Sequence, residues 1–189
     1  MSYPENLRAL SMAGSFAWQI AIGIKPIEYR PWPINSLRGL VLLHTSQTNW
    51  DDTWDEFIDS GDLTLEQTRK AKGCIVGAGF LVGLETYGTQ NYGHVFDGCL
   101  CFAPEDWIPA PGARNYWRAQ KPQQQAAFSR AWELAHTGQW SAIDPDHTLD
   151  LMEQHGFECE MPEPEPDPPA QSRIFLAGPG GNVTEHLLK

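Results

Sequence analysis

The sequence predicts an α+β domain in which a small, barrel-like β-sheet is flanked by helices. Three observations lead to this fold class. The apolar runs have the lengths of strands, and these lengths are mixed. One short helix is expected early, at residues 15–22. The longest strand candidate, residues 73–87, contains internal glycines, which favour strong curvature or close approach between backbones.

Capping and breaking residues define the first elements. Residues 15–22 read Ser-Phe-Ala-Trp-Gln-Ile-Ala-Ile, with apolar side chains near the helical period. Ser15 is a suitable N-cap, and Gly23 is a natural end for the helix. Pro26 cannot donate to a central strand ladder, so we expect a turn before a strand at residues 27–30.

The middle of the chain alternates between strand and helix patterns. Residues 38–46 form a nearly continuous apolar run, which predicts a strand buried on both faces. Residues 53–60 place apolar side chains on one helical face and acids on the other. Thr64 can cap a second short helix that runs to residue 72. The glycine-bearing strand, residues 73–87, follows directly.

The next segments are expected to complete the sheet and cover it. A strand is predicted at residues 94–102, and two short strands are predicted at residues 106–108 and 113–117. Residues 123–137 have the amphipathic pattern of a longer helix. One or two further helical turns are expected at residues 147–155.

Length and composition divide the chain into a domain and an extension. A chain of 189 residues supports one domain with a tail. We place the domain at residues 1–140, and a helical turn, an acidic Pro-rich linker and a tail at residues 141–189. Residues 158–169 alternate Pro with acids, which predicts an extended, solvated segment. Residues 174–179 are expected to form either an edge strand or a flexible end.

The net charge is unevenly distributed along the chain. The formal charge is −11, but residues 144–167 hold nine acids and residues 51–66 hold seven, and neither segment contains Lys or Arg. Without these sixteen acids, the rest of the chain carries a formal charge of +5. This mildly basic remainder is compatible with an anionic ligand, while the acidic segments could recruit a basic protein.

The sequence contains no targeting, membrane or metal-binding pattern. Its apolar runs stay below the roughly 18 residues of a membrane span, and its N-terminus lacks a signal-peptide pattern. The four cysteines form no CxxC pair, and they have no metal-ligand spacing with histidines. We therefore expect a cytoplasmic protein with reduced, mostly buried thiols and with no metal, cofactor, membrane contact or DNA-specific feature.

One eight-residue segment carries a family resemblance. Residues 23–30 read Gly-Ile-Lys-Pro-Ile-Glu-Tyr-Arg, so that Gly23, Lys25, Glu28 and Arg30 follow the pattern Gly-x-Lys-x-x-Glu-x-Arg. This motif lies between a predicted short helix and a predicted strand. In sequence and in position it resembles the core motif of the ASCH family, a branch of the PUA-like superfamily.

Flanking segments extend the resemblance to roughly residues 8–118. Residues 10–18 resemble the first strand and helix of the family, residues 38–46 its second strand, and residues 73–84 its next strand. The resemblance implies a PUA-like barrel. The chain departs from the family at Gly14-Ser15, where many relatives have Gln-Pro before the aromatic residue of the first helix.

The motif is expected to bring three charged side chains together. Glu28 and Arg30 lie two apart on a strand and share one face, and Lys25 can approach them from the preceding turn. Three interpretations remain open. Glu28 and Arg30 form a structural ion pair, or the three side chains line a charged cleft that binds a ligand without chemistry, or Lys25 and Glu28 are catalytic in that cleft, with Lys25 as nucleophile or base.

Three functional hypotheses follow. The leading one is a cleft that binds RNA, a nucleotide or a nucleoside and is lined by Lys25, Glu28, Arg30, Trp32 and His44. The second is an amidohydrolase acting on an N4-acylated, cytidine-like nucleoside, because some small relatives use the motif Lys for this reaction. Those relatives have Thr where this chain has Glu28. The third is a protein-interaction module that uses the acidic segments.

Other side chains are secondary candidates for contacts with a ligand. Aromatic platforms for a base would be Trp18, Trp32 and Tyr92, and phosphate contacts would be Arg8, Arg38, Arg114 and Arg118. Trp18 fits a core position better than a ligand platform. His44 follows an apolar run, which is more typical of a hydrogen-bonded interior histidine than of a ligand contact. Glu85 is the candidate third acid of a hydrolase.

Overall fold

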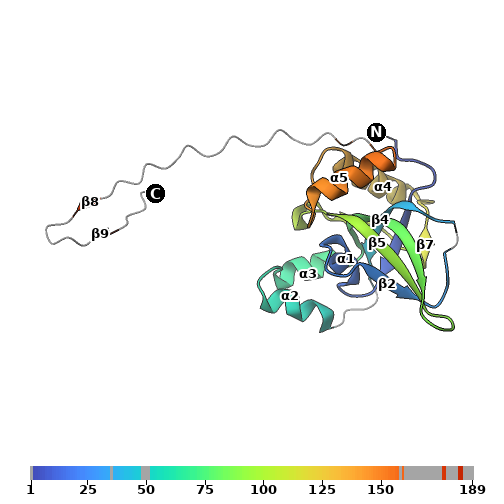
Figure 1. The fold of residues 1–189 in the computed structure, drawn as a ribbon, viewed down its shortest axis with the longest axis horizontal. Coiled ribbons are helices and arrows are strands. Elements are labelled where there is room, and N and C mark those ends of the chain that lie inside the picture. Colours follow the sequence, from blue (N-terminus) through green and yellow to red (C-terminus); the bar gives the residue numbers. More distant parts are fainter. Residues whose placement is uncertain are drawn as a thin grey trace.

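A seven-stranded sheet forms the centre of the protein and curls into a half-barrel (Figure 1). The computed structural model describes residues 2–34, 36–47, 52–157 and 159, and two short strands beyond them. The strands of the main sheet are β1 (Arg8–Met12), β2 (Ile27–Arg30), β3 (Gly39–Thr45), β4 (Cys74–Thr86), β5 (Tyr92–Cys101), β6 (Ile108–Pro109) and β7 (Tyr116–Trp117). The α+β class is therefore confirmed.

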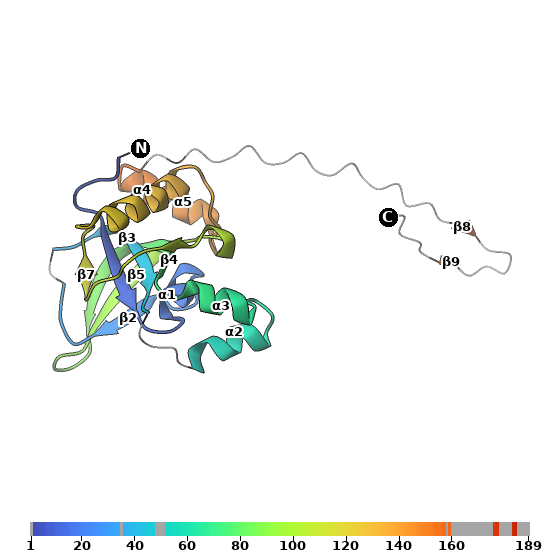
Figure 2. The same cartoon turned by 180° about the vertical axis from the view of Figure 1, so that it is seen from behind.

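Five α-helices accompany the sheet in the described part of the chain. They are α1 (Phe16–Ala21), α2 (Asp55–Asp59), α3 (Leu65–Ala71), α4 (Pro122–His136) and α5 (Pro145–Gln154). Helix α1 packs against β3, β4 and β5. Helices α4 and α5 lie next to each other at one end of the sheet, and α2 and α3 lie at the other end beside α1 (Figures 1 and 2).

The strand order is β2-β5-β4-β3-β1-β7, with the short β6 paired to β4. Among the described strand pairs, only β1 and β3 run parallel, from Arg8 opposite Val41 to Met12 opposite Thr45. A parallel pair needs a crossover connection, which α1 and β2 provide here. The C-terminal ends of β1 and β3 therefore lie side by side. The end of the motif strand β2 lies next to them, because Arg30 bonds to Ser11 in β1.

The two outer strands, β2 and β7, are joined by side chains. The ring of Trp32, just after β2, lies 5.8 Å from the ring of Tyr116 in β7. The guanidinium of Arg30 in β2 donates from Nη2 to the carbonyl of Ser11 in β1 at 3.0 Å. We call this line of contacts the seam. It closes the half-barrel and places the motif beside the ends of β1 and β3.

Strand β4 is curved by bulges, as its glycines predicted. Its register with β5 shifts between Ala78 and Phe80 and again between Leu81 and Gly83, and such bulges bend a strand. The structure also confirms close backbone approach at Gly77. A Cβ atom there would lie 2.3 Å from the carbonyl oxygen of Leu100. This position therefore allows only glycine.

The predicted helix caps have different outcomes. Thr64 caps α3 as predicted, since its hydroxyl accepts from the Gln67 backbone N–H at 3.2 Å and the Gln67 side chain accepts from the Thr64 N–H at 2.7 Å. Ser15 occupies the N-cap position of α1 but makes no capping hydrogen bond. Its hydroxyl instead donates to the Thr53 carbonyl at 2.9 Å. The Gly14-Ser15 turn thus connects α1 to the segment before α2.

Most predicted elements are present, and three expectations need correction. The predicted strand at residues 106–108 is wrong, because Pro104–Asp106 form a 3₁₀ turn and the strand is Ile108–Pro109. The one or two turns expected at residues 147–155 are a full helix, α5, in which Leu151 and Met152 are buried. β8 (Leu176–Ala177) pairs with β9 (Val183–Thr184) as a separate sheet and does not join the edge of the main sheet.

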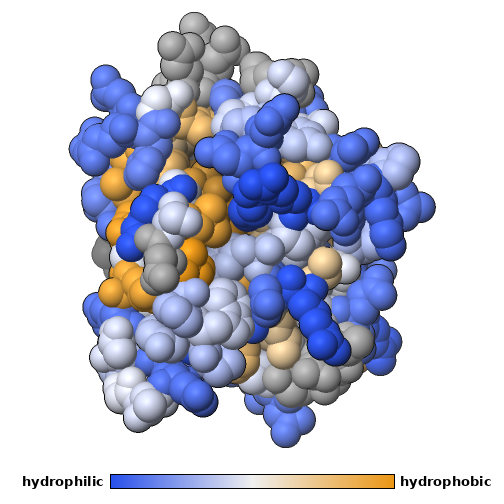
Figure 3. All heavy atoms as spheres, turned by 90° about the vertical axis from the view of Figure 1, so that its right-hand side faces the viewer, coloured by the Kyte–Doolittle hydropathy of each residue, from blue (hydrophilic) through white to orange (hydrophobic). Residues whose placement is uncertain are grey.

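One face of the body carries a hydrophobic hollow, and two further sequence predictions concern the membrane and the Pro-rich segment. On the side of the body that carries β7 and the β4–β5 hairpin, hydrophobic atoms reach the surface in a hollow between hydrophilic side chains (Figure 3). None of the helices in the described part of the chain is long and apolar enough to cross a membrane. The prediction of an extended segment at residues 158–169 lies outside the described residues, apart from Cys159.

Candidate functional site

The three charged residues of the motif form one ion-paired cluster around Glu28. Glu28 is buried, with 6% of its surface exposed. Its Oε2 atom lies 2.5 Å from Nζ of Lys25, and its Oε1 atom lies 3.0 Å from Nη2 of Arg30. One carboxylate thus serves two cations, so the cluster carries a net charge of +1. We call these three residues the motif cluster.

Lys25 is held from several sides. Its ammonium donates to the carbonyl of Ile27 at 2.6 Å in addition to Glu28. It also lies over the ring of Phe16, 5.3 Å from the centroid, where a cation is attracted to the π face. A lysine nucleophile needs a free amine aimed at its substrate. These contacts instead fit a side chain that fixes the position of Glu28.

Arg30 connects the motif cluster to a cavity of about 470 Å³. Its Nη2 atom bonds both Glu28 and the Ser11 carbonyl. Its Nε atom is buried and has no hydrogen-bond partner among the described residues. We call this hollow the Arg30 cavity. Its lining consists of Ser11, Met12, Ala13, Arg30, His44, Ser46, Gln47, Gly112, Ala113, Arg114 and Asn115.

The floor of the Arg30 cavity is buried and its rim is exposed. Met12 and His44 are buried at the ends of β1 and β3, whereas the loop 112–115 is exposed to solvent. The lining includes two guanidinium groups, those of Arg30 and Arg114, and no carboxylate among the residues described. The cavity therefore offers positive charge and polar groups in a protein whose formal charge is −11.

A hydrogen-bond chain fixes His44 in the floor. Nε2 of His44 lies 3.1 Å from the carbonyl oxygen of Ala110, and Nδ1 lies 3.0 Å from Oγ of Ser11. Because a carbonyl can only accept, the network assigns the proton to Nε2 and leaves Nδ1 to accept from Ser11. The Ser11 hydroxyl in turn accepts from Nε1 of Trp117 at 3.0 Å. Burial lowers the pKa of His44, which favours the neutral ring.

His94 is a member of the site that sequence reasoning missed. It lies directly opposite Glu28 on β5 and is fully buried. Its Nε2 atom lies 3.1 Å from the carbonyl oxygen of Trp32, and its Nδ1 atom lies 3.2 Å from the hydroxyl of Tyr116. Burial is the main cause of its lowered pKa. Only the pairing of β2 with β5, which no local pattern reveals, could have identified it.

Trp32 belongs to the seam and not to the lining of the Arg30 cavity. Its ring meets those of His94 and Tyr116 edge-on, with centroids 5.0 and 5.8 Å away. Trp18 is buried and packs edge-on against Trp107 at 5.4 Å, which confirms the expected core position. Tyr92 lies opposite Arg30 on β5.

Glu85 is not placed to act with the motif cluster. It pairs with Gly93, which pairs with Tyr29. Since alternate residues of a strand face opposite sides of the sheet, this row faces away from Glu28. The exposed carboxylate of Glu85 accepts a hydrogen bond from the hydroxyl of Tyr87. The interpretation of Glu85 as a third catalytic acid is therefore wrong for this geometry.

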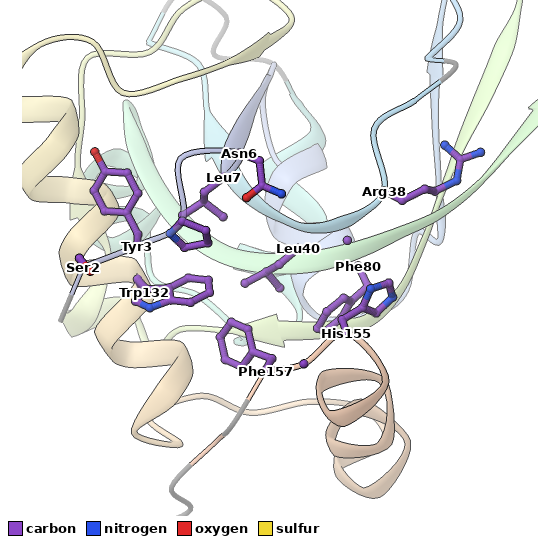
Figure 4. A pocket seen from close by; sticks show the side chains of 13 residues that line it. Ser2, Tyr3, Asn6, Leu7, Arg38, Leu40, Phe80, Trp132, His155 and Phe157 are labelled. Carbon is purple, nitrogen blue, oxygen red and sulfur yellow. The ribbon is translucent and has the colours of Figure 1, made fainter.

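The arginines predicted to meet phosphates are divided among three hollows. Arg114 lines the Arg30 cavity, and Arg8 and Arg118 line a neighbouring hollow. Arg38 lies at the edge of a third hollow of about 560 Å³, where its guanidinium extends away from the lining rings (Figure 4).

The third hollow is aromatic and lies apart from the motif. The side chains of Trp132, Phe157, Phe80 and His155 surround Leu40 (Figure 4). The His155 ring stacks on Phe80 with centroids 5.0 Å apart. None of the motif residues lines this hollow. Its rings come from the segment before β1, from β4, from α4 and from the segment after α5, so it is a feature of the helical end of the molecule.

Metal and thiol chemistry find no support at the site. The described residues contain no group of three or more His, Cys, Asp or Glu side chains that could hold a metal ion. Cys74, Cys99 and Cys101 are free thiols. Burial raises the pKa of the Cys74 thiol to about 11 and those of Cys99 and Cys101 to about 12. These thiols are therefore poor nucleophiles near neutral pH.

Comparisons with known proteins add no assignment. No protein-family model matches the chain, and no curated protein matches it.

Proposed function

We propose that this protein is a PUA-like domain of the ASCH type that binds a nucleotide, free or within a short single-stranded RNA, in the Arg30 cavity. The observation that carries the proposal is the composition of the lining. Arg30 and Arg114 line one hollow to which no described residue contributes a carboxylate, in a chain with a formal charge of −11. Guanidinium groups are well suited to phosphate, which they bind through paired hydrogen bonds.

Size and polarity support a ligand of nucleotide dimensions. A volume of about 470 Å³ lies within the usual range for small-molecule sites, roughly 300–1,000 Å³. Gln47 and Asn115 bring amide groups that can pair with base edges. His44 contributes a buried wall, because both of its ring nitrogens already bond to protein atoms. The exposed rim leaves space for a ligand that continues beyond the cavity.

The motif cluster then has a positioning role. Glu28 orients Arg30 through its Oε1 atom, and Lys25 pairs with the other carboxylate oxygen, Oε2. Neither Lys25 nor Glu28 lines the Arg30 cavity. Hydrolysis of an N4-acylated cytidine would require Lys25 to leave its contacts with Glu28 and Ile27. The geometry therefore favours binding over catalysis.

The test measures nucleotide binding to variants of the rim. Arg114 is exposed, so Arg114→Gln should leave the fold intact. A lost charge-assisted hydrogen bond is worth about 1.5–3 kcal/mol, so the Kd for UMP or a uridine oligonucleotide should rise roughly tenfold or more. Calorimetry measures the Kd for UMP, and fluorescence anisotropy of a labelled uridine oligonucleotide measures the Kd for RNA. Arg69→Gln, on exposed α3, is the matched control and should have no effect.

Two results would contradict the proposal. One is the absence of binding to any of the four nucleoside monophosphates and to RNA. The other is an equal effect of Arg114→Gln and Arg69→Gln. Incubation with N4-acetylcytidine separates binding from hydrolysis: cytidine released by the wild type and not by Lys25→Ala would assign catalysis to the motif instead.

A further inference from the structure

A second hollow, next to the Arg30 cavity, gathers three further cations. It has a volume of about 410 Å³ and lies between β7 and the beginning of α4. Its basic residues are Arg8, Arg118 and Lys121, and no carboxylate of the described residues lines it. We call it the basic hollow. Its full lining is Arg8, Gly112, Ala113, Tyr116, Trp117, Arg118, Gln120, Lys121 and Gln124.

None of the ion pairs among the described residues involves Arg8, Arg118 or Lys121. Nη1 of Arg8 is fixed by the carbonyl oxygens of Leu7 at 2.9 Å and Glu5 at 3.3 Å. Burial first, and then the charge of Arg118, lower the pKa of Arg8, as expected for neighbouring like charges. Like charges repel, so an anion bound between these side chains would relieve their repulsion.

The beginning of α4 adds positive potential to the same place. Helix α4 has 15 residues and begins on the side of the body where β7 lies (Figure 2). Helix N-termini carry partial positive charge, which proteins usually offset with Ser, Thr or Asp at the N-cap and acids in the first turn. Here Lys121 occupies the N-cap and the first turn has no acid. The positive potential of this helix start is therefore not offset by an acidic side chain of its first turn, and such a helix start favours a bound anion.

The basic hollow and the Arg30 cavity are neighbours with a fixed separation. Both are lined by Gly112 and Ala113. The buried side chain of Gln124 anchors this loop, since Nε2 donates to the Pro111 carbonyl at 2.7 Å and Oε1 accepts from the Lys121 N–H at 3.1 Å. A Cβ at Gly112 would lie 2.4 Å from Cε1 of His44. The loop is thus held against both the helix start and the cavity floor.

We infer that the basic hollow binds a second phosphate of the same ligand, so that the ligand is a single-stranded RNA segment crossing the Gly112–Ala113 ridge and not a mononucleotide. This inference rests on the proposed function and specifies its substrate class. A mononucleotide that fills the Arg30 cavity has no anion left for Arg8, Arg118 and Lys121. A phosphodiester chain supplies one for each hollow, as positively charged grooves for single strands require.

The experiment compares a uridine decanucleotide with UMP on the full chain. Arg118 and Lys121 are exposed, so Arg118→Gln and Lys121→Gln should preserve the fold. Each phosphate contact contributes about −0.7 to the slope of log K against log salt for single strands. Each variant should therefore lose about 0.7 of that slope and bind the decanucleotide about fivefold more weakly at 0.1 M salt. UMP affinity should not change, and Arg69→Gln should match the wild type.

The outcomes separate this inference from the proposed function. If Arg114→Gln weakens RNA binding and Arg118→Gln does not, the second phosphate site is wrong and the Arg30 cavity stands. If only Arg118→Gln weakens RNA binding, the basic hollow is the RNA site and the proposed role of the Arg30 cavity is wrong. An equal loss of UMP and RNA affinity in Arg118→Gln would overturn the assignment to a second nucleotide. Equal binding of an acidic decapeptide would overturn the assignment to RNA.

Discussion

The carboxylate of Glu28 organises the motif cluster. The side chain of Glu28 is 8% exposed, while those of Lys25 and Arg30 are 22% and 21% exposed. Both oxygens are used, one for each cation. The same arginine then reaches Ser11 across the seam. A single buried charge therefore connects the turn after α1, the strand β2 and the end of β1.

Replacing Glu28 should destabilise the protein more than replacing a surface acid. Glu28→Gln leaves two half-buried cations without their carboxylate. Breaking a buried pair costs about 3–5 kcal/mol, and the partial exposure of both cations reduces this to about 2–3 kcal/mol. The Tm should fall by roughly 4–12 °C. Calorimetry would check this value.

The matched control is Glu133→Gln. Glu133 pairs with Arg130 on α4, but its side chain is 52% exposed. This pair is worth at most about 1 kcal/mol. A Glu28→Gln variant no less stable than Glu133→Gln would show that the motif cluster does not contribute to folding.

Among the elements, β4 shows most directly how sequence determines packing. Its predicted curvature is present as two bulges against β5. Its glycines nevertheless differ in how much space a side chain would have. A Cβ on Gly77 would collide with the Leu100 carbonyl and lie 2.8 Å from Cβ of Ala21 in α1, whereas one on Gly83 would make ordinary contacts with Val95 at 3.5 Å. Gly77 therefore allows α1 to lie on the sheet.

The pair Gly77→Ala and Gly83→Ala tests this difference within one strand. At Gly77 the added methyl must displace backbone atoms of β5 and the helix α1, and such overpacking costs about 2–3 kcal/mol. We expect a fall in Tm of roughly 4–12 °C for Gly77→Ala. Gly83→Ala should be neutral or slightly stabilising, because Gly weakens a strand interior. Thermal unfolding followed by circular dichroism would show the difference, and equal Tm values would refute it.

In the molecule as a whole, the described core continues past the boundary predicted at residue 140. Leu151 and Met152 of α5 are buried, as is Phe157, which packs against Trp132 with centroids 4.6 Å apart. Helix α5 packs on β5, and the carbonyl of Ser141 accepts from the backbone N–H of Cys101 at 2.8 Å. These contacts make α5 part of the packing of the sheet.

Two truncated chains test where the folding unit ends. A chain of residues 1–140 loses the burial of Leu151, Met152 and Phe157. Each such side chain contributes about 1.5–3 kcal/mol, so the sum approaches the whole stability of a typical domain, about 5–15 kcal/mol. We expect residues 1–157 to unfold cooperatively and residues 1–140 to show no cooperative transition in calorimetry. Cooperative unfolding of the shorter chain near the Tm of the longer one would place the end of the folding unit at residue 140.

The sequence determined the local features of this protein. Hydrophobic periodicity, caps and glycines predicted α1, β2, β3, α3, β4 and α4 closely, because each depends on neighbours within a few residues. The motif spacing also predicted that Lys25, Glu28 and Arg30 would meet. Glu28 and Arg30 lie two residues apart and share one face of a strand, and Lys25 lies in the turn just before that strand. The binding function remains a proposal that the lining of the Arg30 cavity supports.

Tertiary structure alone decided what surrounds those residues. His94 joins the site through the pairing of β2 with β5, and Arg8 meets Arg118 and Lys121 through the pairing of β1 with β7. Both pairings connect segments far apart in the chain, and their register depends on how the whole sheet curls. The same curling separates Trp32 and Glu85 from the Arg30 cavity. A local pattern therefore predicts which residues carry charge, but the long-range register decides which of them share a hollow.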